Sequence, residues 1–434
     1  MGLFVTIFSL ILIVIAVGLA FCKPMQFTFF WVVFGCSYDS CGIVRFLEQY
    51  FGYYGFLMNT ILLFACISSI FRFCQRNHSV SEKRFLITAS LFILGIFISQ
   101  LVVYTLNGIS MLNLVYGFTD YGPPIFIIWL TNFRQYNKNY DSREAITKTV
   151  SIQILIACLI VYLPMAGIHT LDGICGDNFI ADGYVYNRNV CQNLLDIPKM
   201  FVNKYLFNGL GQFHNGNDMG FYGAWGLFLA VYMIMKDRRL HRILWAVALA
   251  YCSLLLWGNS GMRGPIVGLG CGAIVAFLCA KKRSKWIVGI FGILAGGLVM
   301  ISEVGSSLLS YLIPSFSNIS FSSRTELRNN GFSYIAENWL IGAGGLLSSL
   351  TSQRIDPHEL PLRISCMFGV FTGIMCTLLI YVQPIITFFK TRFKDLFVIC
   401  AWFVIFFISI TNNYTDPGLF WILFSESICS MLTR

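Results

Sequence analysis

Charged residues are scarce in this sequence of 434 residues: Asp, Glu, Lys and Arg make up 12% of it, whereas a soluble domain carries about 25%. Hydrophobic residues reach 57%. This deficit excludes an ordinary soluble domain and is typical of a chain that crosses a membrane several times. Lipid offers no water to the backbone, so only helices or a closed barrel can span it, and runs of about 20 apolar residues favour helices.

Patterns that hold metals or nucleotides are also missing. No CxxC pair and no Cys/His set with zinc spacing occurs among the 15 cysteines. There is no Gly-rich phosphate loop and no acidic metal motif. We therefore expect no metal, no cofactor and no nucleic-acid partner, and attribute the formal charge of +10 to the cytoplasmic ends of helices. The first apolar run lacks a basic region and a cleavage site, so we expect it to remain as a helix.

The apolar runs predict an all-α polytopic membrane protein, with about twelve transmembrane helices in a single domain over residues 1–434. The fourth run is the weakest, because it contains Asp120 and the pair Pro123–Pro124, and proline kinks a helix. The aromatic run 26–34 predicts an additional interfacial helix. The expected spans are 3–22, 53–71, 85–106, 110–130, 149–168, 219–235, 243–258, 264–280, 286–302, 366–389, 396–411 and 418–432.

The positive charges predict the orientation. With the N-terminus in the cytoplasm, two thirds of the thirty Lys and Arg fall on the cytoplasmic side, in short basic connectors. The two long polar loops, 169–218 and 303–363, then lie outside the cytoplasm. Cys175 and Cys191 belong to the first of these loops, in an oxidising space, so we expect a disulfide between them, with two free thiols as the alternative.

The loop 303–363 is the longest polar stretch and holds the candidate chemistry. The planar guanidinium of each arginine in it can donate two parallel hydrogen bonds to a phosphate. The unperturbed pKa of its histidine, about 6.5, suits proton transfer near neutral pH. The alternatives are that these arginines pair with loop acids or lipid headgroups, and that the histidine is merely solvated. The external candidates are Arg263, Arg324, Arg328, Arg354, Arg363, Glu326, His214 and His358.

Four segments, taken in order, resemble the O-antigen polymerase and ligase superfamily. GQFHNGN at 211–217 is similar to its G-x-F-x-N-P-N motif, with Gly216 for Pro and Asn217 as the matching Asn. SGMRGP, with Arg263, resembles its S-R-G signature. The third segment is SRTEL followed by ENWLIGAGG, which is similar to R-x-x-x-W … P-L-x-G-x-G with Arg328 for Trp and Trp339 for Pro. The fourth is DPHELPLRISCMFGVFTGI, which is similar to H-N-x-x-L … G-x-x-G with Glu359 for Asn.

This resemblance covers roughly residues 205–380, and residues 1–200 share only hydropathy with the family. It implies a GT-C-like, metal-independent glycosyltransferase on the periplasmic face of the bacterial inner membrane. In the family the donor is a glycan on undecaprenyl pyrophosphate. The matching residues imply that Arg263 and Arg324 hold the pyrophosphate and that His358 acts on the acceptor hydroxyl. Arg328, one helical turn from Arg324, joins the donor site. Weaker candidates for substrate binding are Arg354, Arg363, Asn217, His214 and Glu326.

The expected function is therefore polymerisation of O-antigen or a related surface polysaccharide. The growing glycan would move from undecaprenyl pyrophosphate to a lipid-linked repeat unit. An O-antigen ligase, which moves the glycan to lipid A–core, uses the same donor; the divergent motifs favour the polymerase. A lipid-linked oligosaccharide flippase would instead carry charges inside its helix bundle and short loops on both faces. The expected partners are lipid-linked glycans and the bilayer, with a polysaccharide chain-length regulator as a further candidate.

Overall fold

The structure of the protein is a computed structural model that divides into two compact units. The first unit comprises Met1–Ala16, Phe29–Gly55 and Tyr140–Ser315, and the second comprises Val17–Thr28, Phe56–Asn139 and Phe316–Arg434. The structure describes residues 2–36, 43–74, 80–110, 114, 118, 123–139, 141–165, 178–181, 184–187, 216–260, 264–279, 320–346, 350, 355, 357, 359–386, 396–411 and 418–432.

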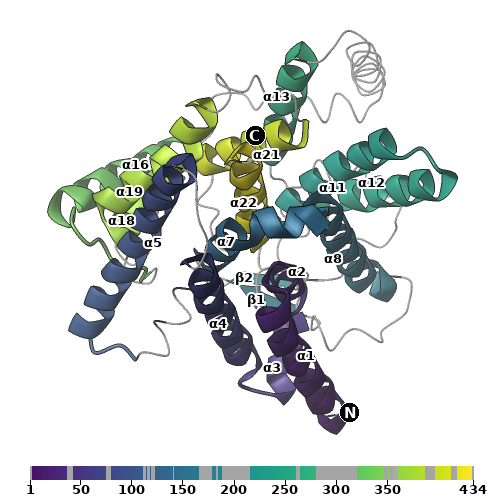
Figure 1. Ribbon diagram of the computed structural model, residues 1–434, viewed down its shortest axis with the longest axis horizontal. Helices are drawn as coiled ribbons and strands as arrows, with labels where there is room; N and C mark the ends of the chain where they lie inside the picture. Colours follow the sequence, from purple (N-terminus) through teal and green to yellow (C-terminus); the bar gives the residue numbers. More distant parts are fainter. Residues whose placement is uncertain are drawn as a thin grey trace. The chain divides into compact units, whose positions relative to one another are not determined.

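Helices make up nearly all of these described residues (Figure 1). Those of the first half of the chain are α1 Gly2–Cys22, α2 Pro24–Phe34, α3 Ile43–Tyr50, α4 Tyr54–Cys74, α5 Val80–Leu106, α7 Pro123–Asn139 and α8 Ser142–Met165. Those of the second half are α11 Gly216–Lys236, α12 Leu240–Ser260, α13 Gly264–Cys279, α16 Ser320–Glu337, α18 Leu360–Phe368, α19 Val370–Thr377, the π-helix η3 Leu378–Val382, α21 Leu396–Thr411 and α22 Gly418–Leu432.

One β-hairpin departs from the all-helical expectation. Strand β1, Asn178–Ala181, pairs antiparallel with β2, Tyr184–Asn187, so that Asn178 lies opposite Asn187. The hairpin belongs to the long loop expected at 169–218. Alternating polar and apolar residues in YVYN suit such a pair, but eight strand residues in a hydrophobic chain give only a weak sequence signal.

Three helices of the first unit pack closely on one another. Helices α11 and α12 lie side by side and α8 packs against both (Figure 1). Small residues make this approach possible: an alanine Cβ at Gly223 would lie 2.6 Å from the backbone nitrogen of Trp257, and one at Gly226 would lie 2.0 Å from Ser253 Oγ. Helix association in lipid depends on such close packing, because lipid chains are as apolar as the side chains themselves.

Helix α22 is the core of the second unit. Every residue from Gly418 to Ser430 is buried, including Glu426 and three serines. Helices α7 and α21 pack against it. On α7, the ring of Phe126 lies 5.1 Å from that of Phe424 and 6.4 Å from that of Trp421, centroid to centroid. These aromatic contacts hold α7 against the core.

Three described helices are long and apolar enough to cross a membrane, namely Gly2–Cys22, Tyr54–Cys74 and Ala89–Leu106. They indicate a membrane protein. Seven shorter apolar helices accompany them within the described residues: Pro24–Phe34, Pro124–Phe133, Gly220–Lys236, Leu240–Leu254, Val370–Ile386, Phe397–Ile410 and Gly418–Ser430. The total of twelve spans remains a prediction, since the ninth, 286–302, lies outside the described residues.

Two expected spans have different limits in the structure. In the fourth, expected at 110–130, helix α7 begins at Pro123 and extends beyond the expected end to Asn139, whereas most of residues 111–122 lie outside the described residues. Proline suits a first helical turn, because its missing N–H has no partner there in any case. The tenth, expected as one helix over 366–389, begins earlier and is divided at Gly369 into α18 and α19. This division creates the candidate site.

Candidate active site

Gly369 separates α18 from α19 because its backbone enters a region that side chains avoid. Its φ is 87°, and an alanine Cβ there would lie 2.2 Å from the carbonyl oxygen of Leu340. The next residue, Val370, donates its N–H to the carbonyl oxygen of Trp339 at 2.8 Å. The start of α19 is therefore bonded to a segment about 30 residues earlier in the chain rather than to α18.

The partner segment is a glycine turn over residues 339–345, which we call the WLIGAGG turn. Gly342 and Gly344 have φ values of 67° and 62°, and an alanine Cβ at Gly342 would lie 2.5 Å from the carbonyl oxygen of Cys366. The N–H of Ala343 bonds to that same oxygen at 2.9 Å, and the N–H of Gly345 bonds to the carbonyl of Met367 at 3.2 Å. The turn thus satisfies carbonyls at the end of α18 that would otherwise lack partners.

Helix α5 supports both segments from one side. Ser99 Oγ donates to the carbonyl oxygen of Ile341 in the turn at 2.5 Å, and it lies 3.4 Å from the carbonyl oxygen of Met367 in α18. One turn earlier, Gly95 leaves room for Thr372 of α19, whose Oγ1 would lie 2.3 Å from an alanine Cβ. A small-residue face of α5 therefore fixes the turn and the divided helix together.

Helix α16 brings the predicted donor segment to the same place. Cys366 Sγ donates to the carbonyl oxygen of Gly331 at 3.6 Å. An alanine Cβ at Gly331 would lie 3.3 Å from Pro357 Cγ and 3.5 Å from Leu362 Cδ2. Pro357 immediately precedes His358 in the sequence, and Arg328 lies one turn before Gly331. The two loop segments that carry predicted arginines and the predicted histidine therefore meet at α16 and α18.

The predicted residues divide into four groups by their placement, of which buried Arg363 is described below. Arg328 and Glu326 are exposed on α16. Arg324 lies on α16, and Asn217 near the start of α11, but the side chains of both are outside the described residues. The remaining predicted positions fall outside the described residues: Arg263, Arg354, His358, His214, Cys175 and Cys191. Their roles stay predictions.

Arg363, one of the weaker candidates for substrate binding, is buried in the structure. It lies on α18 with only 4% of its surface exposed. Its backbone N–H donates to the carbonyl oxygen of Glu359 at 2.9 Å. A guanidinium stays charged, and burying a charge is costly unless other groups compensate it. The sequence ranks Arg363 below Arg324, because no motif position marks it; the structure makes it the cation packed most deeply among the described candidates.

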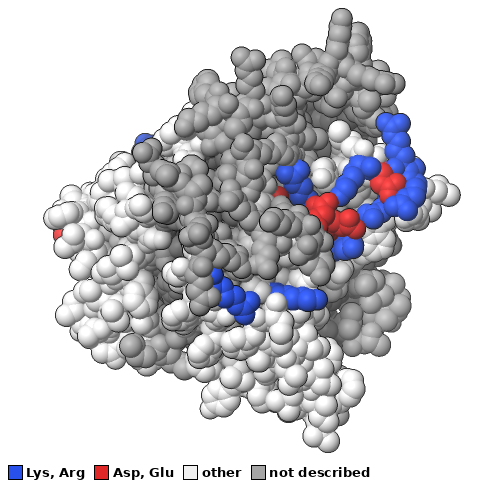
Figure 2. Space-filling view, viewed as in Figure 1, with Lys and Arg blue, Asp and Glu red and all other residues white. Residues whose placement is uncertain are grey.

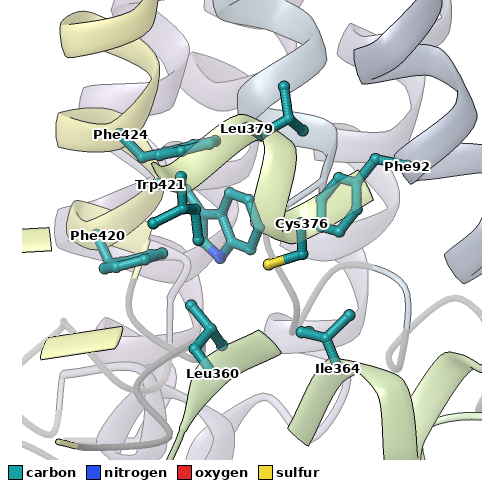
Figure 3. Close-up of a pocket in the computed structure, with 9 residues that line it drawn as sticks. Phe92, Leu360, Ile364, Cys376, Leu379, Phe420, Trp421 and Phe424 are labelled. Atoms are coloured by element: carbon teal, nitrogen blue, oxygen red, sulfur yellow. The ribbon is translucent and has the colours of Figure 1, made fainter. Parts of the chain in front are cut away.

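A small apolar pocket adjoins this helix in the second unit (Figure 3). Leu360 and Ile364 of α18 form one side, and Phe92 of α5 and Trp421 of α22 reach into the same space. The other lining residues are Cys376, Leu379, Ile380, Phe420 and Phe424. No sequence pattern indicates this pocket, because its residues come from five helices and share no local motif.

A second polar feature lies in the first unit, where the ends of α8, α11 and α12 form an ionic network. Lys236 Nζ lies 2.5 Å from Asp141 Oδ2 and 3.9 Å from Glu144 Oε2. Arg242 connects Glu144, at 3.5 Å, to Asp237, at 3.7 Å. Figure 2 shows acidic and basic side chains gathered in one cluster. The network joins two basic connectors that the sequence predicts to lie on the same side of the membrane.

The network shifts the pKa values of its members. Partial burial is the largest single effect and would raise the pKa of Asp141, but the hydrogen bond and charge of Lys236, together with the backbone N–H groups of Glu144 and Arg143, lower the pKa below its ordinary value. The hydrogen bond to Asp141 in turn raises the pKa of Lys236. The hydrogen bond from Arg239 lowers the pKa of Asp237 to about 2. The lowered pKa of each acid and the raised pKa of Lys236 favour the charged forms, which attract one another across the helix ends.

Two further observations bear on the site. Among the described residues, no group of three or more His, Cys, Asp or Glu side chains is arranged to hold a metal ion. Comparison of the chain with protein-family models, with curated proteins and with solved structures finds no match.

Proposed function

We propose that this protein is a polymerase of O-antigen or a related surface polysaccharide in the bacterial inner membrane. It transfers the growing glycan from undecaprenyl pyrophosphate to a lipid-linked repeat unit on the periplasmic face. The observation that carries the proposal is the contact between the WLIGAGG turn and α18–α19. These are two of the four segments that resemble the polymerase and ligase superfamily, and they form one substructure through Gly342 and Gly369.

The chemistry follows from the residues in and near this substructure. In the transfer, the bond between the anomeric carbon and the pyrophosphate oxygen breaks, and the acceptor oxygen bonds to that carbon. The departing pyrophosphate gains negative charge, so preorganised cations stabilise the transition state more than the ground state. Arg263, Arg324 and Arg328 take this role in the proposal, and His358 accepts the proton of the acceptor hydroxyl.

The glycan phenotype of a deletion strain tests this function. Lipid A–core that carries single repeat units indicates loss of a polymerase. Bare core with accumulated lipid-linked polymer indicates loss of a ligase. An unchanged polysaccharide pattern in the deletion strain contradicts both.

Substitutions test the assignment of residues. Arg324→Ala and Arg263→Ala are each expected to abolish long chains while the protein remains inserted, and normal ladders on a silver-stained gel would contradict the donor site. His358→Ala is expected to abolish activity while donor binding persists. Polymer formed by His358→Ala would place the base elsewhere.

One observation favours a lipid-linked oligosaccharide flippase as a second candidate. Glu426 is fully buried in α22, the core helix of the second unit, and accepts a hydrogen bond from Ser430 Oγ at 2.9 Å. Acids buried in a membrane bundle often mark a transport pathway. Purified protein in liposomes, supplied with lipid-linked repeat units, separates the two functions: a polymerase lengthens the glycan, whereas a flippase changes only the leaflet in which it lies.

A further inference from the structure

Large apolar side chains are exposed where the sequence predicts an aqueous loop. Phe332 near the end of α16 is 58% exposed, and Trp339 and Leu340 at the start of the WLIGAGG turn are 60% and 63% exposed. The rest of α16 is mostly polar. Single exposed apolar residues are ordinary, but three within nine positions, two of them on a rigid turn, indicate a surface that water does not cover.

The position of the turn beside α5 gives its depth. The apolar span Ala89–Leu106 has 18 residues, about 27 Å of helix, which nearly matches a hydrocarbon core of about 30 Å. Gly108, with φ 63°, follows the end of the helix. Leu106 therefore marks one edge of the hydrocarbon layer, the edge that the predicted topology places outside the cytoplasm.

Two contacts fix the turn below that edge. Ser99, which bonds to the carbonyl of Ile341, precedes Leu106 by seven residues, or ~10 Å along the helix axis. Val103 contacts Gly344 and precedes Leu106 by three residues, or ~5 Å. The turn therefore lies alongside the outer third of α5, at the depth of lipid hydrocarbon rather than in the aqueous phase.

Neighbouring surfaces at this level are also apolar. Ile98 on α5 is 47% exposed, and Phe371 and Ile374 on α19 are 49% and 50% exposed. Phe371 follows Val370, which bonds to Trp339. The exposed side chains of the turn thus continue a surface formed by two apolar helices. The backbone of the turn is irregular, but its Ala343 and Gly345 N–H groups bond to α18, as lipid requires of any irregular backbone.

We infer that the WLIGAGG turn is a re-entrant element of the membrane domain, inserted into the outer leaflet. Trp339 and Leu340 contact lipid acyl chains, and Phe332 lies nearer the interface. Arg328 lies on α16 one helical turn before Phe332 and is therefore farther from the WLIGAGG turn. It lies at the level of the lipid phosphates, whose negative charge complements its positive charge. The loop 303–363 is then partly embedded. This inference does not depend on the proposed function, because it uses only packing, depth and exposed apolar surface.

Site-specific labelling in spheroplasts tests this insertion. The azide-bearing amino acid p-azidophenylalanine replaces Phe332, Trp339 or Leu340 in separate variants, and Asn329, exposed on the polar part of α16, serves as the matched control. A membrane-impermeant strained alkyne is then added. We expect efficient labelling at Asn329 and loss of labelling at Trp339 and Leu340, with full labelling of every variant after unfolding in SDS. Labelling at Leu340 as fast as at Asn329 overturns the inference.

A crosslinking experiment identifies what covers the turn. A diazirine amino acid placed at Leu340 is irradiated in native membranes, and the protein is analysed by mass spectrometry. We expect phospholipid adducts at position 340 and none when the diazirine is placed at Asn329. Adducts only to protein, from this chain or a second copy, contradict the inference, because the turn would then be covered by protein.

Discussion

Ser99 on α5 donates a hydrogen bond to the carbonyl oxygen of Ile341 at 2.5 Å, although the two residues are 242 positions apart. The same hydroxyl lies 3.4 Å from the carbonyl oxygen of Met367. One buried side chain therefore touches both segments of the candidate site. Ser99 belongs to the part of the chain that resembles the polymerase and ligase superfamily only in hydropathy, so the site depends on a region without recognisable motifs.

Replacing this hydroxyl tests its role as a support. Ser99→Ala removes the hydroxyl that donates to the carbonyl oxygen of Ile341. The loss of a partner for a buried carbonyl lowers the free energy of unfolding by about 1–3 kcal/mol. We expect a lower unfolding temperature for the purified protein in detergent and shorter glycan chains in cells. Ser90→Ala, on the exposed face of the same helix, is the control and should change neither. Equal behaviour of the two variants contradicts the proposed support.

Arg328 tests the donor site without disturbing the core. Its side chain is exposed on α16, and substitutions at exposed positions change stability by only about 0.5 kcal/mol. We therefore expect Arg328→Ala to fold normally and to lose long glycan chains, measured on silver-stained gels. Arg238→Ala, another exposed arginine in the connector between α11 and α12, is the matched control and should keep normal chains. Long chains in both variants remove Arg328 from the donor site.

The ionic network predicts a dependence of stability on pH. The pKa of Asp141 is lowered in the folded protein, so its contribution is complete above the unfolded pKa of about 4 and is lost as pH falls through the folded value. Both partners of the pair with Lys236 are 44% exposed, so solvent screening limits the effect to about 0.5 kcal/mol. We expect Asp141→Asn to lower stability at pH 7 and to flatten the acid side of the unfolding-temperature profile. An unchanged profile contradicts a contribution from this pair.

Composition and periodicity predicted the helical character of the fold well, because a span needs only a run of apolar residues. They failed where tertiary contacts decide the backbone. The run 366–389 is predicted as one helix. Its local sequence does not show that the chain turns at Gly369 and that the N–H of Val370 bonds to the carbonyl oxygen of Trp339. Helix α7 extends to Asn139 because its polar end continues the helix beyond the apolar run, and a sequence prediction that depends on apolar residues stops earlier.

The candidate site was predictable in its segments and not in its assembly. The glycines of the WLIGAGG turn and Gly369 lie in the two quoted motifs, and the structure gives their physical reason, which is positive φ and close backbone contact. Ser99 carries no such mark, since a serine in an apolar run is common and usually bonds within its own helix. The burial of Arg363 likewise depends on how α18 packs, which local sequence does not encode.

The β-hairpin strengthens the prediction of a disulfide between Cys175 and Cys191, which themselves lie outside the described residues. Cys175 precedes β1 by three residues and Cys191 follows β2 by four, and paired antiparallel strands hold their outer ends together. We expect Cys175→Ser to free one thiol that reacts with a membrane-impermeant maleimide in spheroplasts. The double variant Cys175→Ser, Cys191→Ser is the control and should show no added reaction. Two reactive thiols in the unreduced native protein would show that the bond does not form.

Gly369→Ala tests the division of the tenth span. The residue has φ 87°, and an alanine Cβ would lie 2.2 Å from the carbonyl oxygen of Leu340 and 2.7 Å from its carbonyl carbon. Both contacts are with backbone, which cannot rotate away. This backbone conformation, with ψ 160°, is essentially restricted to glycine and alone costs about 1–3 kcal/mol for a residue with a side chain. We expect the WLIGAGG turn to separate from α19, with faster proteolysis after Arg328 and complete loss of long glycan chains. Gly270→Ala on α13 is the control, because nothing lies within 4 Å of its Cβ position, and it should retain native protease resistance. If Gly369→Ala keeps both protease resistance and chain length, then the contact between the turn and α19 does not form the working site, and the proposed function loses the observation that carries it.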